Sequence, residues 1–235
     1  MIIAITGSSG YIGKMLLKKI LQTDHQVRVL SRKPMLKNNL YTSYIGDLTD
    51  SKVDLSSFLD EVDILYHCAG EINNEMLMNQ LHVDGTKMLL SQSQGKVARW
   101  VQLSSVGAYG QCRNEEVTEK SSEQPSSIYE VSKTISDNLV IDSGIPYSIL
   151  RPSNIFGKGM VNQSLYGLIK IIKKGVFFFI GKSGALLNYI HEDKVVDALI
   201  NCGNNSNAIG EVCVLSQSMT VEKMVWTIMD GLNIK

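Results

Sequence analysis

The sequence is poor in cysteine and has no long apolar run. Its four cysteines, Cys68, Cys112, Cys202 and Cys213, share no metal-ligand spacing with each other, and the histidines do not complete one. We therefore expect free thiols in a reducing compartment and no metal site. A membrane-spanning helix needs ~20 apolar residues, and the longest apolar candidate, residues 175–180, is far too short.

The chain also lacks an excess of charge of either sign. Its 23 Lys and Arg balance 23 Asp and Glu, so the formal net charge is zero. Such a balance offers no general attraction to nucleic acid or to an anionic membrane. The first residues, MIIAIT, contain no basic segment of a secretory signal. We expect a cytoplasmic protein with neither a nucleic-acid partner nor a membrane partner.

Short β-branched apolar runs alternate with longer amphipathic segments in the first two thirds of the chain. This alternation predicts an α/β fold, a Rossmann-type doubly wound parallel sheet covered by helices on both faces. The predicted strands are residues 2–6, 26–30, 41–45, 62–67, 99–104 and 146–151, and the predicted helices between them are residues 11–22, 74–92 and 126–142.

The pattern loosens after residue 151. Further helices are predicted at residues 165–172, from about residue 192 and at 220–229, with a strand at 211–215. We predict a dinucleotide-binding Rossmann domain over residues 1–155. Residues 156–235 are predicted to form a small C-terminal substrate-binding lobe, interleaved with the first domain.

A glycine motif lies between the first predicted strand and the first predicted helix. Its sequence, GSSGYIG over residues 7–13, is a G-x-x-G-x-x-G run. Glycines there allow a tight turn and let backbone N–H groups approach a pyrophosphate at the start of a helix. The predicted cofactor contacts of this loop are Gly7, Ser9, Gly10, Tyr11, Ile12 and Gly13.

The opening IAITGSSGYIG resembles the cofactor loop of the extended, nucleotide-sugar-modifying branch of the short-chain dehydrogenase/reductase superfamily. In NAD-binding proteins of this fold an acidic residue ends the second strand and binds the ribose hydroxyls. Here that strand runs into Ser31, Arg32 and Lys33. Arg32 can bind a 2′-phosphate in a bidentate manner, although Arg32 and Lys33 can equally be solvated surface charges. We predict NADP as the cofactor, with NAD as the alternative, and Ser31 and Arg32 as contacts.

Two further stretches resemble cofactor contacts of the same branch. Asp47 and Leu48, after the third strand, correspond to an adenine-contacting pair, although Asp47 can also be a plain turn or cap residue. Ala69 belongs to the stretch HCAG, which corresponds to a segment lying along the cofactor.

Tyr129 and Lys133 form a Y-x-x-x-K motif on a predicted helix, where positions i and i+4 share a face. A phenol titrates near 10, and a nearby cation lowers that pKa. The resemblance makes Tyr129 the general acid/base, whereas Lys133 tunes Tyr129 and binds the nicotinamide ribose. The stretch SSVGAYG resembles the branch's serine signature and makes Ser105 the hydrogen-bond donor to the substrate oxygen. The stretch RPSNIFG resembles a further signature and makes Asn154 a substrate contact.

Three positions differ from residues that members of the branch carry. His82, in HVDGT, replaces an Asn that shapes the active site in family members. Val106 and Gly107 stand where sugar 4,6-dehydratases carry Asp-Glu, which argues against dehydration. The resemblance therefore implies an NAD(P)-dependent epimerase or ketoreductase acting on a nucleoside-diphosphate sugar through Ser105, Tyr129 and Lys133. A homodimer is compatible with it. The alternative is a non-catalytic NAD(P)-binding redox sensor or assembly factor, which typically loses the Tyr or the Lys.

Overall fold

The large unit of the protein is a seven-stranded, fully parallel sheet. The computed structural model describes residues 1–34, 39–110, 116–160 and 164–234. The strand order is β3-β2-β1-β4-β5-β6-β9, which confirms the predicted Rossmann-type fold. The strands are β1 (Ile2–Thr6), β2 (Gln26–Ser31), β3 (Thr42–Ile45), β4 (Ile64–His67), β5 (Trp100–Leu103), β6 (Tyr147–Pro152) and β9 (Glu211–Leu215).

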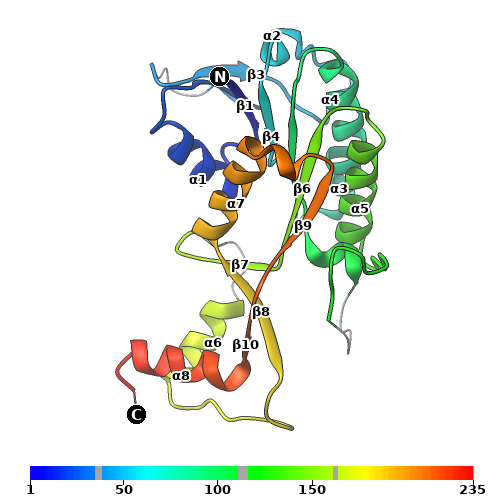
Figure 1. The fold of residues 1–235 in the computed structure, drawn as a ribbon. Coiled ribbons are helices and arrows are strands. Elements are labelled where there is room, and N and C mark those ends of the chain that lie inside the picture. Colours follow the sequence, from blue (N-terminus) through cyan, green and yellow to red (C-terminus); the bar gives the residue numbers. More distant parts are fainter. Residues whose placement is uncertain (35–38, 111–115, 161–163, 235) are drawn as a thin grey trace.

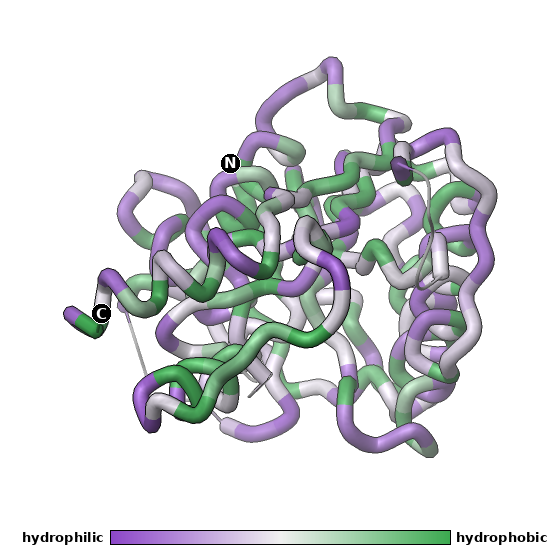
Figure 2. The backbone as a smooth tube through the Cα atoms, turned by 90° about the horizontal axis from the view of Figure 1, so that it is seen from below, coloured by the Kyte–Doolittle hydropathy of each residue, from purple (hydrophilic) through white to green (hydrophobic). Residues whose placement is uncertain are grey.

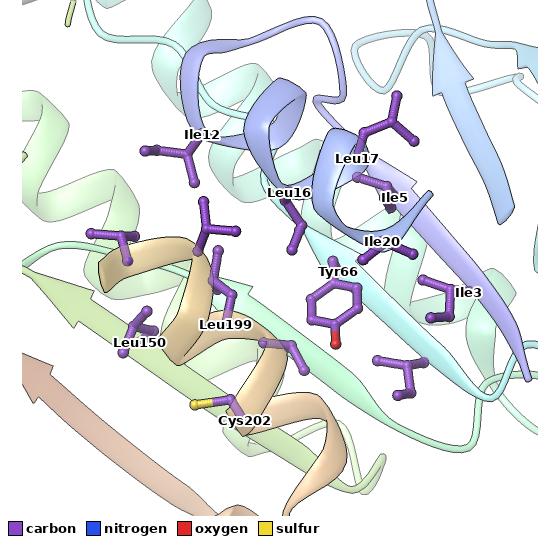
Figure 3. Packing of buried hydrophobic residues seen from close by; sticks show 14 of the residues in the cluster. Ile3, Ile5, Ile12, Leu16, Leu17, Ile20, Tyr66, Leu150, Leu199 and Cys202 are labelled. Carbon is purple, nitrogen blue, oxygen red and sulfur yellow. The ribbon is translucent and has the colours of Figure 1, made fainter. Parts of the chain in front are cut away.

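Helices cover both faces of this sheet (Figure 1). One face carries α1 (Tyr11–Ile20) and α7 (Glu192–Asn204), whose buried apolar side chains pack on β1, β2, β4 and β5. Figure 3 shows Leu16 of α1, Leu199 of α7 and Tyr66 of β4 in this cluster. The approach of α7 is close, because a Cβ on Gly203 would lie 2.1 Å from the Tyr66 hydroxyl.

The opposite face carries α2 (Ser56–Leu59), α4 (Thr86–Ser93) and α5 (Ile128–Ile141) around a second apolar cluster that includes Phe58, Leu89 and Trp100. The single helix predicted over residues 74–92 is continuous but not uniform. It begins as α3 (Glu75–Met78), passes through a π-helical segment, η1 (Asn79–Gly85), and ends as α4. Such π segments occur frequently at functional sites.

A smaller lobe lies beyond the carboxyl ends of the strands (Figure 1). It contains a three-stranded sheet in the order β10-β8-β7, with α6 (Ser164–Lys173) and α8 (Val221–Gly231). Its strands are β7 (Asn154–Phe156), β8 (Leu186–His191) and β10 (Gln217–Thr220). The chain enters the lobe after β6, returns to the large sheet for α7 and β9, and then enters the lobe again. None of the described helices is long and apolar enough to cross a bilayer.

Candidate active site

The glycine loop makes the turn from β1 into α1 by close backbone contacts. Gly7 has φ +69°, and a Cβ there would lie 2.6 Å from the backbone of Cys68 and Ala69. A Cβ on Gly13 would lie 2.2 Å from the Gly7 carbonyl oxygen, so α1 packs directly on the loop. At Gly10 a Cβ would meet only the Gly7 oxygen, at 3.2 Å. Gly10 is therefore the glycine whose side-chain space is left for a ligand rather than for packing.

A cavity of about 180 Å³ opens beside this loop, at the carboxyl ends of β1, β2 and β4. This is where the strand order reverses, the place where open α/β sheets bind their ligands. Eight of the predicted cofactor residues line the cavity, namely Gly7, Ser9, Gly10, Ser31, Arg32, Asp47, Leu48 and Ala69.

Three other predicted residues of the loop lie elsewhere. Ile12 is 5% exposed and packs in the core, and Gly13 is also buried in α1. The Tyr11 hydroxyl donates a hydrogen bond to Glu192, the first residue of α7. Tyr11 also borders a wider groove of about 550 Å³ along α1, whose lining includes Lys14 and Lys158.

Two cavity residues have local structural roles as well. The Asp47 carboxylate accepts hydrogen bonds from the backbone N–H and the hydroxyl of Thr49, at 2.9 and 2.8 Å. The Ser31 hydroxyl donates to the carbonyl of Lys33 at 2.9 Å and so tightens the turn that carries Arg32. Arg32 is exposed and borders the cavity, and no described acidic side chain follows β2 directly.

Tyr129 and Lys133 are carried by α5, whose start is fixed by a capping box. The Glu130 N–H donates to Ser127 Oγ at 3.2 Å, and the Ser127 N–H donates to Glu130 Oε2 at 3.0 Å. This cap places Tyr129 in the first turn. Lys133 is buried one turn later, and its ammonium donates to the Leu103 carbonyl at the end of β5, at 2.6 Å.

Ser105 follows β5 and caps the short 3-10 helix η2 (Val106–Tyr109), accepting the Gly107 N–H at 3.1 Å. The Ser105 side chain also lowers the pKa of the Tyr129 phenol. Burial is the larger influence on Tyr129, so its pKa is raised above the ordinary value. The Lys133 ammonium is held by the Leu103 carbonyl, and its expected influence on Tyr129 stays a prediction.

Beneath this group lies a buried ion pair that the motifs did not indicate. Asp137 is fully buried on α5, one turn after Lys133, and accepts from Ser104 Oγ at 2.7 Å and from Arg151 Nε at 3.0 Å. Burial raises the pKa of Asp137, whereas Lys133 and Arg151 lower it. The one sequence feature that could have indicated Asp137 is its spacing. It lies four residues after Lys133, as Lys133 lies four residues after Tyr129, so the three residues share one face of the helix.

His82 connects the cavity to α5. Its Nε2 accepts the Glu71 N–H at 2.8 Å, its Nδ1 lies 2.9 Å from Ser132 Oγ, and its ring meets the Tyr129 ring edge-on with centroids 5.7 Å apart. Because Nε2 accepts, Nδ1 carries the proton and donates to Ser132. Burial, with Lys133 nearby, lowers the pKa of His82 to about 3, so the ring is neutral.

In the lobe, Asn154 is exposed at the start of β7, where it pairs in register with Tyr189 of β8. Phe156 packs edge-on against Tyr189 and His191, with centroid distances of 6.1 and 5.2 Å. His191 caps α7 by accepting the Asp193 N–H at 3.3 Å. Among the described residues, no group of three His, Cys, Asp or Glu side chains is arranged to hold a metal ion.

A family model described as the NAD dependent epimerase/dehydratase family matches residues 3–214. A putative UDP-glucose 4-epimerase of Methanocaldococcus jannaschii is 25% identical over 88% of this chain and 75% of its own length. A 3-beta-hydroxysteroid dehydrogenase of Mycolicibacterium neoaurum is 25% identical over 80% of this chain and 57% of its own length. The chain thus spans between about half and three quarters of the curated relatives it matches.

The fold is similar to that of the UDP-glucuronic acid 4-epimerase of Bacillus cereus, solved in complex with NAD. The TM-score is 0.84 at 20% identity, over all of this chain and 84% of the other.

Proposed function

This chain belongs to the NAD-dependent epimerase/dehydratase family, and from that premise we propose that it transfers a hydride between a nicotinamide cofactor and a hydroxyl of a nucleoside-diphosphate sugar. The observation that carries the proposal is the placement of Tyr129 and Lys133 on one face of α5, with Lys133 bound to the end of β5 and Tyr129 joined through His82 to a cavity beside a glycine loop. A relative named as a putative UDP-glucose 4-epimerase supports the sugar substrate.

The residues present fit a dinucleotide. The glycine loop leaves a cradle at Gly10, and α1 begins there with its unpaired N–H groups, which favours a pyrophosphate. Asp47, Leu48 and Arg32 line the same cavity and would hold the adenosine end of the cofactor. When bound, the nicotinamide supplies the hydride acceptor or donor.

The side chains of this protein would then handle the proton. Tyr129 takes the proton from the substrate hydroxyl, or returns it, at the phenol oxygen. Ser105 donates a hydrogen bond to the same substrate oxygen as charge develops. Lys133, anchored on the Leu103 carbonyl, presents its remaining N–H groups to the ribose. Asn154 at the start of β7 contacts the substrate from the lobe.

Epimerisation or ketone reduction is favoured over dehydration by the space around η2. A Cβ on Gly107 would lie 2.7 Å from Glu130 Cγ, and Glu130 is fixed by the capping box of α5. An acidic side chain therefore has no room at this position, where dehydratases of the branch carry one.

The decisive experiment incubates the protein with NADP+ or NAD+ and a panel of nucleoside-diphosphate sugars, and separately with NADPH or NADH and the corresponding 4-ketosugars. Interconversion of two sugars without net loss of nicotinamide absorbance would identify an epimerase, and stoichiometric loss a ketoreductase. Tight NADPH binding without turnover of any sugar would instead favour the non-catalytic sensor.

A second substrate class belongs in the same panel. The steroid dehydrogenase relative, and another named as a ceramide reductase, suggest a hydroxyl or ketone on a lipid. Turnover of a hydroxysteroid or a ketolipid, with none of any sugar, would move the proposal to that class while leaving Tyr129 and Ser105 in the same roles.

Cofactor choice is tested separately at Arg32. We expect NADPH to bind more tightly than NADH, because Arg32 beside the cavity can pair with a 2′-phosphate. Arg32→Asp should reverse the preference by repelling that phosphate, as titration of nicotinamide fluorescence would measure. Lys33→Asp, one residue further along, is the matched control. Tighter NADH binding by the unmodified protein would contradict this prediction.

A further inference from the structure

The small lobe exposes a run of large apolar side chains. The segment between α6 and β8, residues 174–185, contains the sequence VFFFI over residues 176–180. Val176 is 60% exposed, Phe178 71% and Ile180 84%, whereas Phe177 and Phe179 pack edge-on against each other. We call residues 176–180 the apolar loop.

The apolar loop lies at the end of the molecule farthest from the large sheet (Figure 1). Figure 2 views the molecule from that end and shows a hydrophobic stretch of the chain at the front. Trp226 is 63% exposed on α8, the helix of the lobe that contacts α6. It is one turn from Glu222 on the same helix face, and Glu222 accepts the Gly184 N–H at 3.0 Å.

The charge around the apolar loop is positive although the whole chain is neutral. Residues 143–191 contain no Asp or Glu. Exposed lysines stand on both sides of the loop, at Lys170, Lys173, Lys174 and Lys182, and we call these four the lysine rim. The acidic side chains of the lobe are Glu222 and Asp230 on α8. Over residues 153–191 and 216–234, six lysines and two acids leave a net charge of +4.

We propose that the apolar loop and the lysine rim dock this protein on the surface of an anionic phospholipid bilayer. Aromatic and aliphatic side chains inserted at the headgroup level, with lysines around them, are the combination that peripheral membrane segments use. A Trp at the same end is typical of the membrane–water boundary. The expectation of no membrane partner rested on the neutral net charge of the whole chain and on the absence of a spanning run. Surface docking needs only a local positive patch and no spanning run.

Charge also argues against the simplest other occupant, a second copy of the chain. A two-fold interface places the same surface on both partners, so pairing through the apolar loop would bring one lysine rim against the other. An anionic lipid surface satisfies the same lysines. Docking through the apolar loop requires neither a particular substrate nor turnover. Vesicle binding can therefore be measured separately from the proposed function.

The test is co-flotation of the protein with vesicles of phosphatidylcholine alone or with 30% phosphatidylglycerol added. We expect at least ten-fold stronger binding to the anionic vesicles, weakened by salt. A blue shift of tryptophan emission should accompany binding, and it reports Trp226 because the other tryptophan, Trp100, is fully buried.

Two double variants and their controls complete the test. Phe178→Ser with Ile180→Ser, and Lys173→Glu with Lys174→Glu, should each lower vesicle binding at least ten-fold at an unchanged melting temperature. The controls, Leu40→Ser with Ile209→Ser and Lys14→Glu with Lys18→Glu, alter exposed side chains of the large unit and should bind as the unmodified protein does. Absence of vesicle binding, or equal binding by the loop variants, would overturn the proposal. So would a dimer in light scattering that the Phe178/Ile180 variant converts to a monomer.

Discussion

Tyr129 owes its position to the cap of α5, and its chemistry to burial and Ser105. Tyr129→Phe removes only the hydroxyl, so cofactor affinity should stay nearly unchanged while turnover falls ~10²–10⁴-fold, the range typical of general acid–base catalysis. Steady-state kinetics with the substrate identified by the panel, together with nicotinamide titration, would measure both. Unaltered turnover in Tyr129→Phe would end the proposed mechanism.

The pH dependence of turnover tests the influence of Ser105 on the pKa of Tyr129. Ser105 lowers the pKa of Tyr129 against the raising effect of burial. Ser105→Ala should therefore move the limb of the rate profile that reports Tyr129 to higher pH, in addition to its effect on turnover at neutral pH. In ketone reduction, where Tyr129 donates the proton, this is the basic limb. A profile that stays in place would show that Ser105 does not contact the ionising phenol.

His82 acts through its neighbours and should behave as a positioning residue. His82→Phe keeps the ring but removes the hydrogen bonds to the Glu71 N–H and to Ser132. We expect several-fold weaker NADPH binding, because the cavity wall at Gly70 and Glu71 loses its anchor, and about ten-fold slower turnover. His82→Asn, which restores hydrogen-bonding capacity, should recover part of both. A loss of stability alone, with Kd and turnover intact, would reduce His82 to a packing role.

For single residues, the sequence predicted which side chains belong to the candidate site better than it predicted the groups that they contact. The motifs indicated Ser105, Tyr129 and Lys133, but a motif says nothing about the Leu103 carbonyl that holds the lysine. His82 was visible as a departure from a family pattern, and its role depends on the Glu71 N–H, a backbone group that no sequence pattern marks. Asp137 was missed because its partner Arg151 lies on another element.

The turn from β1 to α1 shows how glycines of one element differ in function. Gly10→Val should lower dinucleotide affinity at least ten-fold with little change in melting temperature, since its Cβ would meet one backbone oxygen at 3.2 Å and otherwise face the cavity. Gly13→Val should unfold the protein or lower its melting temperature sharply, because its Cβ would lie 2.2 Å from the Gly7 oxygen. Dye-monitored melting and nicotinamide titration compare the two.

Gly10→Val and Gly13→Val serve as controls for each other, because the first should change affinity without changing stability and the second should change stability. Loss of folding in both variants, or unchanged affinity in Gly10→Val, would contradict the assignment of Gly10 to the ligand.

The positions of the strands and helices of the large unit could be predicted because their buried apolar side chains recur at regular spacing along the sequence. The strand at Glu211–Leu215 was predicted at its observed bounds, and α5 within two residues. The strands of the lobe were harder to predict from the sequence. β7 has three residues and β10 four, too few for a period, and both are edge strands of a small sheet whose register depends on β8. The π segment in η1 was invisible, since apolar spacing there remains helical.

Over the whole molecule, buried neutral histidines link stability to pH. His67 is 1% exposed between Thr6 and Thr86, and burial lowers its pKa to about 3. The unfolded chain takes up a proton on this ring below about 6.5. The stability is therefore fully present above that pH and is lost as pH falls toward 3.

Between pH 7 and pH 5 the unmodified protein should lose about 2 kcal/mol more stability than His67→Gln, as the pKa difference implies. Urea unfolding at the two pH values would measure it. A parallel response of both proteins would mean that His67 is protonated in the folded state.

The chain passes between the large unit and the lobe three times, at Ser153 after β6, at the junction of β8 and α7, and at Ser216 between β9 and β10. A recombination event with a single breakpoint therefore cannot exchange one lobe for another. New specificity acquired by exchange requires two insertions made together, one for residues 153–191 and one from residue 216 onward, around a retained α7 and β9. Point changes inside the existing lobe are the simpler evolutionary route, and a grafted lobe should be built with both inserts.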